Sequence, residues 1–255
     1  MKKSIFMILI LCLISSISSS QAHFRFNKDQ LESEIVYHQL EPKPQPIAPT
    51  TAYDSESPMI ALTFDDGPSK YVTDEILDIL EENGAKATFF VLGSNAEQYP
   101  DKLKRAVSLG CEIGNHTYNH PNLFKLDIED IKYQVDTTKW CVYEACGVQP
   151  TLVRPPYGNH NSAIRTALPY PIIMWSVDTL DWENRDADKI IEIVLKKASD
   201  GDIILMHDLY KSTSKACKTI IPELIKRGYQ LVTVSELLEA KGVTAVNGKS
   251  ISNVR

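Results

Sequence analysis

Between residues 59 and 240, short apolar runs alternate with amphipathic stretches whose apolar residues recur every three or four positions. The almost wholly apolar run Met59–Phe64 predicts a buried strand, whereas Tyr71–Glu82 places Val72, Ile76 and Leu80 on one face of a helix. On the same grounds we expect further strands at residues 87–92, 111–114, 151–153, 171–177, 202–206 and 230–234, and further helices at residues 100–109, 128–142, 162–168, 187–198, 213–227 and 235–240.

Strands that alternate with helices predict a parallel sheet with helices on its outside. About seven such units follow one another here, in a stretch somewhat shorter than the roughly 200 residues or more that a complete barrel of this kind needs. We therefore expect an α/β fold that forms a small, incomplete (β/α) barrel of about seven parallel strands.

The first 22 residues do not follow this pattern. Lys2 and Lys3 precede an apolar run at residues 5–14, and a serine-rich stretch leads to Ala22. This arrangement is typical of a secretory signal peptide, because the apolar run is too short to span a bilayer comfortably. We expect a secreted or cell-envelope protein, and an uncleaved membrane anchor is the main alternative.

The rest of the chain divides into three parts. Residues 23–57 are polar, and the repeated prolines of Glu41–Pro46 predict an extended, flexible leader. The folded domain is expected at residues 58–240. The polar tail at residues 241–255 is expected to be disordered.

Charge and cysteine content narrow the classes of function. The chain has 27 basic and 33 acidic residues, and loss of Lys2 and Lys3 with the signal peptide takes the net charge from −6 to −8. Such a protein is a poor candidate for binding nucleic acid or an anionic membrane, whereas a neutral polymer would not be repelled. Four cysteines remain after the signal peptide, without zinc-site spacing and with three disulfide pairings open: Cys111, Cys141, Cys146 and Cys217.

Residues capable of chemistry follow five of the predicted strands. In parallel α/β proteins the working residues gather where strands end, so this repetition indicates a site, although each residue alone has a structural explanation. Asp65 and Asp66, for example, would alone be read as a solvated turn before Gly67 and Pro68. The full set is Asp65, Asp66, His116, His120, Arg154, Tyr157, Asp178, Asp181 and His207.

His116 and His120 are the candidate metal ligands. If the segment between them makes a helical turn, both imidazoles face one way and can bind one ion. Asp66 could be the third ligand, which leaves a position for water, as catalytic metal sites require. An isolated pair of this kind is as often a cap or a surface feature, but the chain has only six histidines and a carboxylate at a matching strand end.

Two further motifs could complete an active site. Arg154-Pro155-Pro156-Tyr157 is a stiff turn in which the Tyr157 amide would be a fixed donor facing the cleft, unless the turn is purely structural. His207 ends a predicted strand and could be oriented by Asp181, although a lone histidine in this place is more often a core residue.

Five motifs of the chain resemble, in the same order, those of the polysaccharide deacetylases, which are carbohydrate esterase family 4 with the NodB-homology domain. They are Thr63-Phe-Asp-Asp-Gly67, His116-Thr-Tyr-Asn-His120, Arg154-Pro-Pro-Tyr157, Asp178-Thr-Leu-Asp-Trp182 and Leu205-Met-His207. The resemblance covers residues 58–240. It implies a distorted barrel and metal-dependent removal of acetyl groups from sugars.

The resemblance also implies a role for each matching residue. Asp66, His116 and His120 would hold a divalent ion, usually Zn²⁺, with Co²⁺, Mn²⁺ or Fe²⁺ as alternatives. The remaining implied roles are Asp65 as general base, Arg154 as its partner, the Tyr157 amide as oxyanion donor, His207 as general acid tuned by Asp181, and Trp175 and Leu205 as walls of the acetyl pocket. For Trp175, burial in the barrel core is an equal alternative.

We predict an enzyme that removes N-acetyl groups from N-acetylglucosamine polymers, with peptidoglycan ahead of chitin. The pair of His207 and Asp181 suits an amine, which must be protonated as it leaves. The alternatives are an acetylxylan esterase with the same site and a catalytically silent sugar-binding module, which the complete set of ligands, base and acid disfavours. We expect a monomer whose partner is an acetylated amino-sugar polysaccharide, with no nucleic acid and no stable membrane insertion.

Overall fold

β1 (Met59–Asp65) is the middle strand of a parallel sheet in the computed structural model, which describes residues 53–255. All its residues are buried, as the apolar run predicts. The other strands of this sheet are β2 (Thr88–Val91), β3 (Glu112–Asn115), β5 (Val177–Asp178), β6 (Asp202–His207) and β7 (Gln230–Leu231). Their order is β3-β2-β1-β6-β5, and β7 pairs with the first residues of β1. Every pair in this sheet is parallel, which confirms the predicted α/β class.

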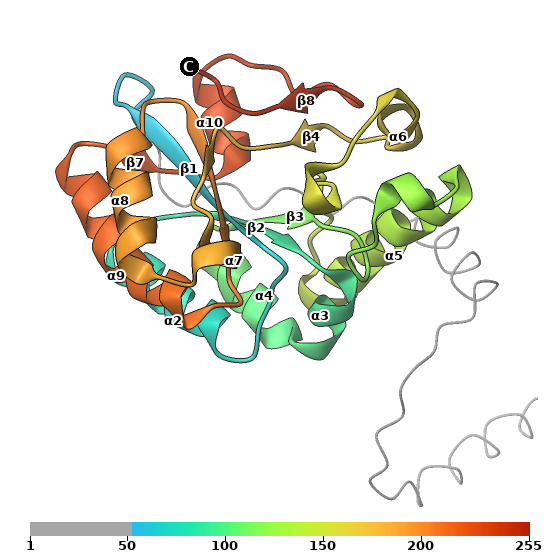
Figure 1. Ribbon diagram of the computed structural model, residues 1–255, viewed down its shortest axis with the longest axis horizontal. Coiled ribbons are helices and arrows are strands. Elements are labelled where there is room, and N and C mark those ends of the chain that lie inside the picture. The colour runs from blue at the N-terminus through green and yellow to red at the C-terminus, as the bar shows by residue number, and fades with distance from the viewer. Residues whose placement is uncertain (1–52) are drawn as a thin grey trace, which may run out of the picture. The chain divides into compact units, whose positions relative to one another are not determined.

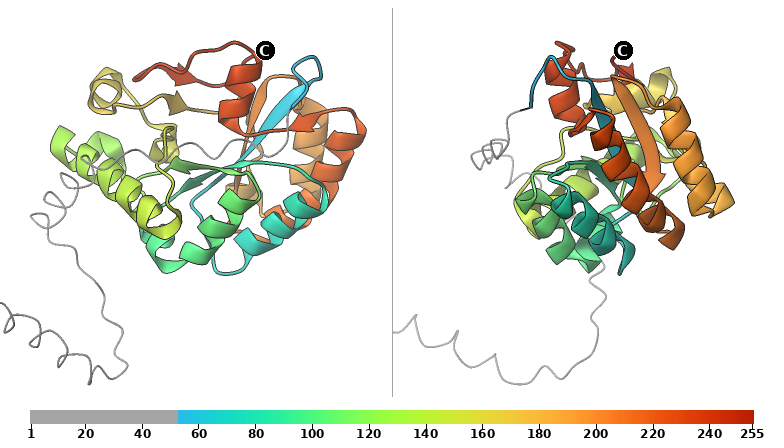
Figure 2. Two further views of the ribbon diagram at one scale, coloured as in Figure 1. Left: turned by 180° about the vertical axis from the view of Figure 1, so that it is seen from behind. Right: turned by 90° about the vertical axis from the view of Figure 1, so that its left-hand side faces the viewer.

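The helices predicted from apolar periodicity are all present, and most of them cover the outside of the sheet. They are α2 (Val72–Glu82), α4 (Pro100–Ser108), α5 (Ile128–Cys146), α6 (Ser162–Ala167), α8 (Ala187–Lys197), α9 (Lys211–Lys226) and α10 (Val234–Ala240). Figure 1 shows α8, α9, α2, α4 and α5 as an arc around the strands, and Figure 2 shows the same arc from behind. Apolar side chains between the two layers form the main core, and each fully buried Leu or Phe stabilises the fold by about 1.5–3 kcal/mol.

The barrel closes irregularly on the side opposite β1. The predicted strand at residues 171–177 is divided into two short strands, β4 (Ile172–Ile173) and β5. The segment that joins them passes from hydrogen bonding with residue 153 to hydrogen bonding with β6. The Ile173 amide donates to the Val153 carbonyl oxygen (2.9 Å), and the Ser176 amide donates to that of Ile203 (3.0 Å). The single-residue bridge at Val153 replaces the strand predicted at residues 151–153. The result is the distorted, incomplete barrel that was predicted.

Both ends of the described chain pack more closely on the barrel than the sequence indicated. Tyr53, near the end of the predicted leader, packs against an apolar cluster that includes Met59, Val232 and Leu237, and the Asp54 amide donates to Gln230 Oε1 (2.9 Å). The leader before Tyr53 and the predicted signal peptide lie outside the described residues.

The prediction of a disordered tail is wrong. β8 (Ser250–Ile251) pairs with β4, and Arg255 Nη2 lies 2.7 Å from Asp202 Oδ1 at the start of β6. Gly201 has φ of 84°, and a Cβ there would lie 2.7 Å from the Val254 backbone, so the tail passes directly over this turn. The sequence did not indicate that the tail is ordered, because its composition is polar. Backbone pairing and a few apolar contacts hold the tail on the barrel.

The structure contains no disulfide among the described residues. Cys111, Cys141, Cys146 and Cys217 are free thiols, so none of the three open disulfide pairings is formed. Within residues 53–255, no helix has both the length and the apolar character needed to cross a bilayer.

Candidate active site

The register of β1 against β6 places Asp65 directly beside His207. Side chains of paired residues in neighbouring parallel strands lie on the same face of a sheet, so these two point the same way. Asp65 is buried and the His207 side chain is 12% exposed. A candidate base and a candidate acid therefore lie next to each other where the two strands end.

Asp66, His116 and His120 converge beside this pair. Asp66 Oδ1 lies 3.4 Å from His116 Nε2 and 3.5 Å from His120 Nε2, and one ligand atom from each residue fits within 4.8 Å of the others. Asp66 Oδ1 is buried and has no hydrogen-bond partner among residues 53–255. Burying a carboxylate oxygen without a partner is energetically costly, and a divalent cation would supply that partner. Two imidazole nitrogens and a carboxylate oxygen at these distances are a suitable ligand set for such a cation.

Hydrogen bonding and burial prepare His116 as a ligand. Its Nδ1 lies 2.6 Å from the Arg154 carbonyl oxygen, which can only accept, so Nδ1 carries the proton and Nε2 is left for the ion. Burial lowers the pKa of His116 to about 3, although the charge of Asp66 opposes this. The imidazole is therefore neutral, as a metal ligand must be.

The two histidines do not converge through a helical turn, so that expectation is wrong. The segment is irregular, and Thr117 and His120 have φ of 72° and 60°. Asp66 and Tyr157 also have positive φ, at 72° and 59°. Non-glycine residues are rarely found in this region, and such strained positions cluster at functional sites. The loop conformations therefore bring the ligands together, at some cost in backbone energy.

Arg154 holds Asp65 in place from inside the barrel. Its Nη1 donates to Asp65 Oδ1 (2.7 Å) and to Thr63 Oγ1 (2.8 Å), and its other nitrogens donate to two backbone carbonyls of residues 173 and 174. The guanidinium is fully buried between the rings of Phe90 and Trp175. Burial raises the pKa of Asp65 above its ordinary value, and Arg154 limits this rise. The predicted pairing of these two residues is confirmed.

Tyr157 and Trp175 lie together at the edge of the metal ligands. The Tyr157 ring meets His120 edge-on at 4.6 Å, and its side chain is 63% exposed. Tyr157 follows Pro156 in a short 3-10 turn (η2, Pro156–Gly158), whose first amides have no partner inside the turn. Its N–H therefore has no acceptor within the turn and can donate to a ligand. Trp175 is half-buried, and a Cβ on Gly158 would lie 2.9 Å from its ring.

Asp181 and His207 form the other half of the site. Asp181 begins the short helix α7 (Asp181–Asn184) and is fully buried. Its Oδ1 lies 2.7 Å from His207 Nδ1, while its Oδ2 accepts from the His207 amide (2.8 Å) and from Thr213 Oγ1 (2.7 Å). Burial alone would lower the pKa of His207, but the hydrogen bond and charge of Asp181, together with Asp65 and Asp66, raise it to about 9. The imidazole is therefore cationic at neutral pH.

Comparison with known proteins identifies the group to which this site belongs. The family model for polysaccharide deacetylase matches residues 52–169. A peptidoglycan-N-acetylglucosamine deacetylase of Bacillus cereus is 41% identical over 194 residues, which are 72% of this chain and 89% of that protein.

This chain belongs to the polysaccharide deacetylase family.

Other polysaccharide deacetylases resemble the chain over a smaller share of their length. Peptidoglycan-N-acetylmuramic acid deacetylase PdaC of Bacillus subtilis is 40% identical over 84% of this chain and 45% of its own length. Peptidoglycan-N-acetylglucosamine deacetylase PgdA of Listeria monocytogenes is 44% identical over 71% of this chain and 39% of its own. The chain thus spans less than half the length of these two relatives.

Solved structures confirm the fold. A structure described as T48 deacetylase with substrate has a TM-score of 0.76 at 43% identity, and the match covers 79% of this chain and all of that one. A family 4 acetyl xylan esterase of Clostridium thermocellum, solved with a cobalt ion, has a TM-score of 0.74 at 30% identity and covers 77% of this chain and 98% of its own. The candidate metal ligands described above fit a metal-dependent family.

Two residues next to predicted site residues were given no role from the sequence. Trp182 follows Asp181 and is 46% exposed, and its carbonyl oxygen accepts from Arg185 Nε (2.9 Å). Asp208 follows His207 and is fully buried, and burial raises its pKa to about 7. Its Oδ2 accepts from Thr73 Oγ1 (2.5 Å), and a Cβ on Gly67 would overlap its carboxylate. The glycine of the Asp65-Asp66-Gly67 turn therefore makes room for Asp208, a reason that no local pattern reveals.

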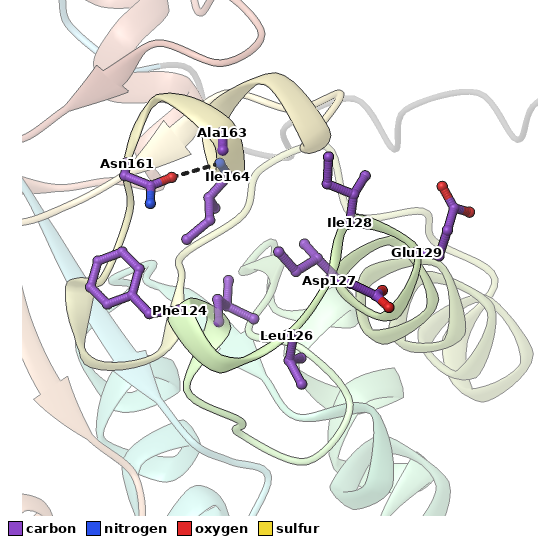
Figure 3. Close-up of a pocket in the computed structure, with 10 residues that line it drawn as sticks. Phe124, Leu126, Asp127, Ile128, Glu129, Asn161, Ala163 and Ile164 are labelled. Atoms are coloured by element: carbon purple, nitrogen blue, oxygen red, sulfur yellow. Dashed lines mark hydrogen bonds between the residues drawn. The ribbon is translucent and has the colours of Figure 1, made fainter.

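The remaining predicted residues have less direct positions. Asp178 Oδ1 accepts from the Leu180 amide (2.8 Å), so this side chain shapes the loop before α7. Leu205 is buried in β6, beside Thr63 of β1. A cavity of about 520 Å³ lies elsewhere, between the start of α5 and α6, and none of the predicted site residues lines it. Figure 3 shows its mainly apolar wall, which includes Leu126, Ile128 and Ile164.

Proposed function

We propose that this protein is a metal-dependent hydrolase that removes N-acetyl groups from N-acetylglucosamine residues of a polysaccharide, with peptidoglycan as its main substrate. The observation that carries the proposal is the pairing of Asp65 with His207 across β1 and β6, next to the convergent Asp66, His116 and His120. A base, an acid and a metal position thus lie within one site.

Each protein group has a defined task in this reaction. A bound divalent ion would polarise the amide carbonyl and lower the pKa of water. Asp65, fixed by Arg154, takes a proton from the water whose oxygen attacks the carbonyl carbon. The Tyr157 N–H donates to the oxygen on which negative charge develops. The carbon–nitrogen bond then breaks, His207 gives its proton to the departing nitrogen, and the products are a free amine and acetate.

The protonated His207 favours an amide substrate over an ester. An amine is a poor leaving group unless it receives a proton as the bond breaks, and the partners of His207 keep it cationic at neutral pH. An alkoxide leaves more easily and needs this acid less. Because a similar solved structure is a family 4 acetyl xylan esterase, hydrolysis of an acetyl ester is the second candidate function. A silent sugar-binding module is disfavoured, because ligands, base and acid are all present.

Peptidoglycan is placed ahead of chitin by two further lines of support. Related proteins are named as peptidoglycan deacetylases, and residues 1–57 have the composition of a signal peptide and an extended leader. We also propose that the protein works outside the cytoplasm as a monomer, secreted or attached to the envelope. Zn²⁺ is the proposed ion, since two imidazoles and one carboxylate suit it, with Co²⁺, Mn²⁺ and Fe²⁺ as alternatives.

The test is acetate release from purified peptidoglycan, chitin oligomers and acetylated xylan, at equal concentrations of enzyme and metal. The protein is first stripped with a chelator and then restored with Zn²⁺, and the stripped protein serves as the control. We expect release from both glucosamine polymers, fastest from peptidoglycan, and none before metal is restored. Much faster release from xylan would show that the protein is an acetylxylan esterase and not an amidase. No release from any polymer would support a catalytically silent sugar-binding module.

A further inference from the structure

Arg185 lies at the rim of the active site in an arrangement that the proposed reaction does not use. It ends α7 with φ of 51°, and its Nε donates to the Trp182 carbonyl oxygen (2.9 Å). Its guanidinium carbon lies 3.2 Å from the centre of the Tyr210 ring. The Tyr210 ring is itself 6.0 Å from the ring of His207. The charge of Arg185 is therefore held two side chains away from the candidate general acid.

The charge of Arg185 is not paired within the described part of the chain. Among residues 53–255, no carboxylate lies within ion-pair distance of its nitrogens, although the residue is exposed. Two other exposed cations differ, since Lys211 pairs with Glu75 and Lys70 lies against the ring of Tyr71. A guanidinium stacked on an aromatic ring loses water from one face while its remaining N–H groups stay available in a planar fork. That fork matches the two oxygens of a carboxylate.

We propose that Arg185, supported by Tyr210, binds a carboxylate of the substrate polymer next to the sugar that loses its acetyl group. The inference rests on the proposed function and narrows its substrate to glucosamine polymers that carry carboxylates, such as glycan strands with lactyl ether groups. The net charge, −6 for the whole chain and −8 without the predicted signal peptide, repels such a polymer, so a local cation near His207 offsets that repulsion.

The alternative is that Arg185 only ends α7. Its Nε bond to Trp182 would then be its whole role, and its loss would affect all substrates alike. A carboxylate-binding role instead makes the effect depend on the charge of the ligand. The two cases are separated by ligands that differ only in that charge.

The experiment measures binding to the Zn²⁺-loaded Asp65→Asn protein, in which turnover does not interfere. The probes are a peptidoglycan tetrasaccharide with free lactyl carboxylates, the same tetrasaccharide with these groups converted to methylamides, and the neutral tetramer of N-acetylglucosamine. Adding Arg185→Gln should weaken binding of the carboxylated probe about tenfold, since a hydrogen bond to a charged group is worth about that factor. Binding of the other two probes should stay within about twofold.

Three controls sharpen the result. Arg185→Lys keeps the charge but loses the fork, so it should lose part of the affinity for the carboxylated probe. Lys196→Gln removes an exposed charge from the last turn of α8 and should change nothing. In the active enzyme, Arg185→Gln should raise KM for the carboxylated probe and leave kcat nearly unchanged.

Equal weakening of all three probes, or of none, would overturn the proposal. So would a parent protein that binds the carboxylated probe no better than its methylamide. Failure of the proposed function has a different signature: the wild-type protein would release no acetate from any probe, even while Arg185 discriminates between the charged and neutral forms.

Discussion

His116 and His207 belong to one site, and the structure gives His116 a low and His207 a high affinity for a proton. Both side chains are largely buried, which lowers the pKa of an imidazole. The main difference is what Nδ1 contacts: the Arg154 carbonyl oxygen for His116, and the Asp181 carboxylate for His207. Neighbouring charges add to it, since Asp65 and Asp66 also raise the pKa of His207. The pKa of His116 falls to about 3, whereas that of His207 rises to about 9.

This difference divides the site into a metal half and a proton-transfer half. A neutral dipole orients a histidine without charging it, so His116 can offer a lone pair to an ion. A buried carboxylate keeps a histidine charged, so His207 can deliver a proton. The partner of one ring nitrogen therefore decides which chemistry a histidine performs.

The largest effect is expected from breaking the metal half. His116→Ala, His120→Ala and Asp66→Ala should each remove bound metal, because three ligands leave no spare. The loss of activity should exceed the roughly 10–100-fold that follows loss of an outer partner of a metal ligand. Metal content and acetate release are measured together, with the exposed Lys196→Gln variant as the control. Full activity in a variant shown to be free of metal would rule out the metal half.

Asp65→Asn tests the boundary between the two halves. It keeps the shape of the side chain and removes the base, so we expect metal content to stay normal while turnover falls about 10²–10⁴-fold. Turnover near that of the wild type would mean that another group is the base. Loss of metal would instead place Asp65 among the ligands, because its Oδ2 lies 3.7 Å from His116 Nε2.

The sequence alone predicts the main helices, most strands of the parallel sheet and most of the candidate residues at the strand ends, but not α3 (Gly93–Gln98), α7 or β8. Those predictions succeed because apolar periodicity and catalytic residue types are local signals. It does not predict that residues 116–120 form an irregular loop, that the segment after Ile173 crosses between strands, or that Arg185 stacks on Tyr210. These features depend on strained dihedral angles and on contacts between distant segments, which no local pattern encodes.

Asp181→Asn should lower the pKa of His207, and so make this histidine more like the neutral His116. Burial would then act with less opposition, so the pKa of His207 should fall from about 9 and the alkaline limb of the pH profile should move to lower pH. In the metal-loaded enzyme the ion offsets the charge of Asp66, so the wild-type limb should lie at or below that value. The measurement is kcat/KM for an amide substrate across this range. An unchanged limb would mean that His207 is not the acid.

The same variant makes a prediction about stability. The pKa of His207 is raised on folding above its ordinary value of about 6.5, so its contribution is fully present below that pH and is lost as pH rises through about 9. The difference in the free energy of unfolding between wild type and Asp181→Asn should therefore shrink across this window. A difference that is independent of pH would show that Asp181 acts only as a neutral hydrogen-bonding group.

Thr213→Val should give the smallest effect, because it leaves both charges of the proton-transfer half in place. Thr213 Oγ1 donates to Asp181 Oδ2, which still accepts from the His207 amide after the change. We expect the free energy of unfolding to fall by about 0.5–1.5 kcal/mol, the usual net worth of one hydrogen bond. Asp181 loses one of the groups that position it beside His207 but keeps its charge, so the alkaline limb should move less than in Asp181→Asn. Thr213→Ser keeps the hydroxyl and should behave as wild type in both measurements. If Thr213→Val moves the limb as far as Asp181→Asn does, then the position of Asp181, more than its charge, sets the proton affinity of His207.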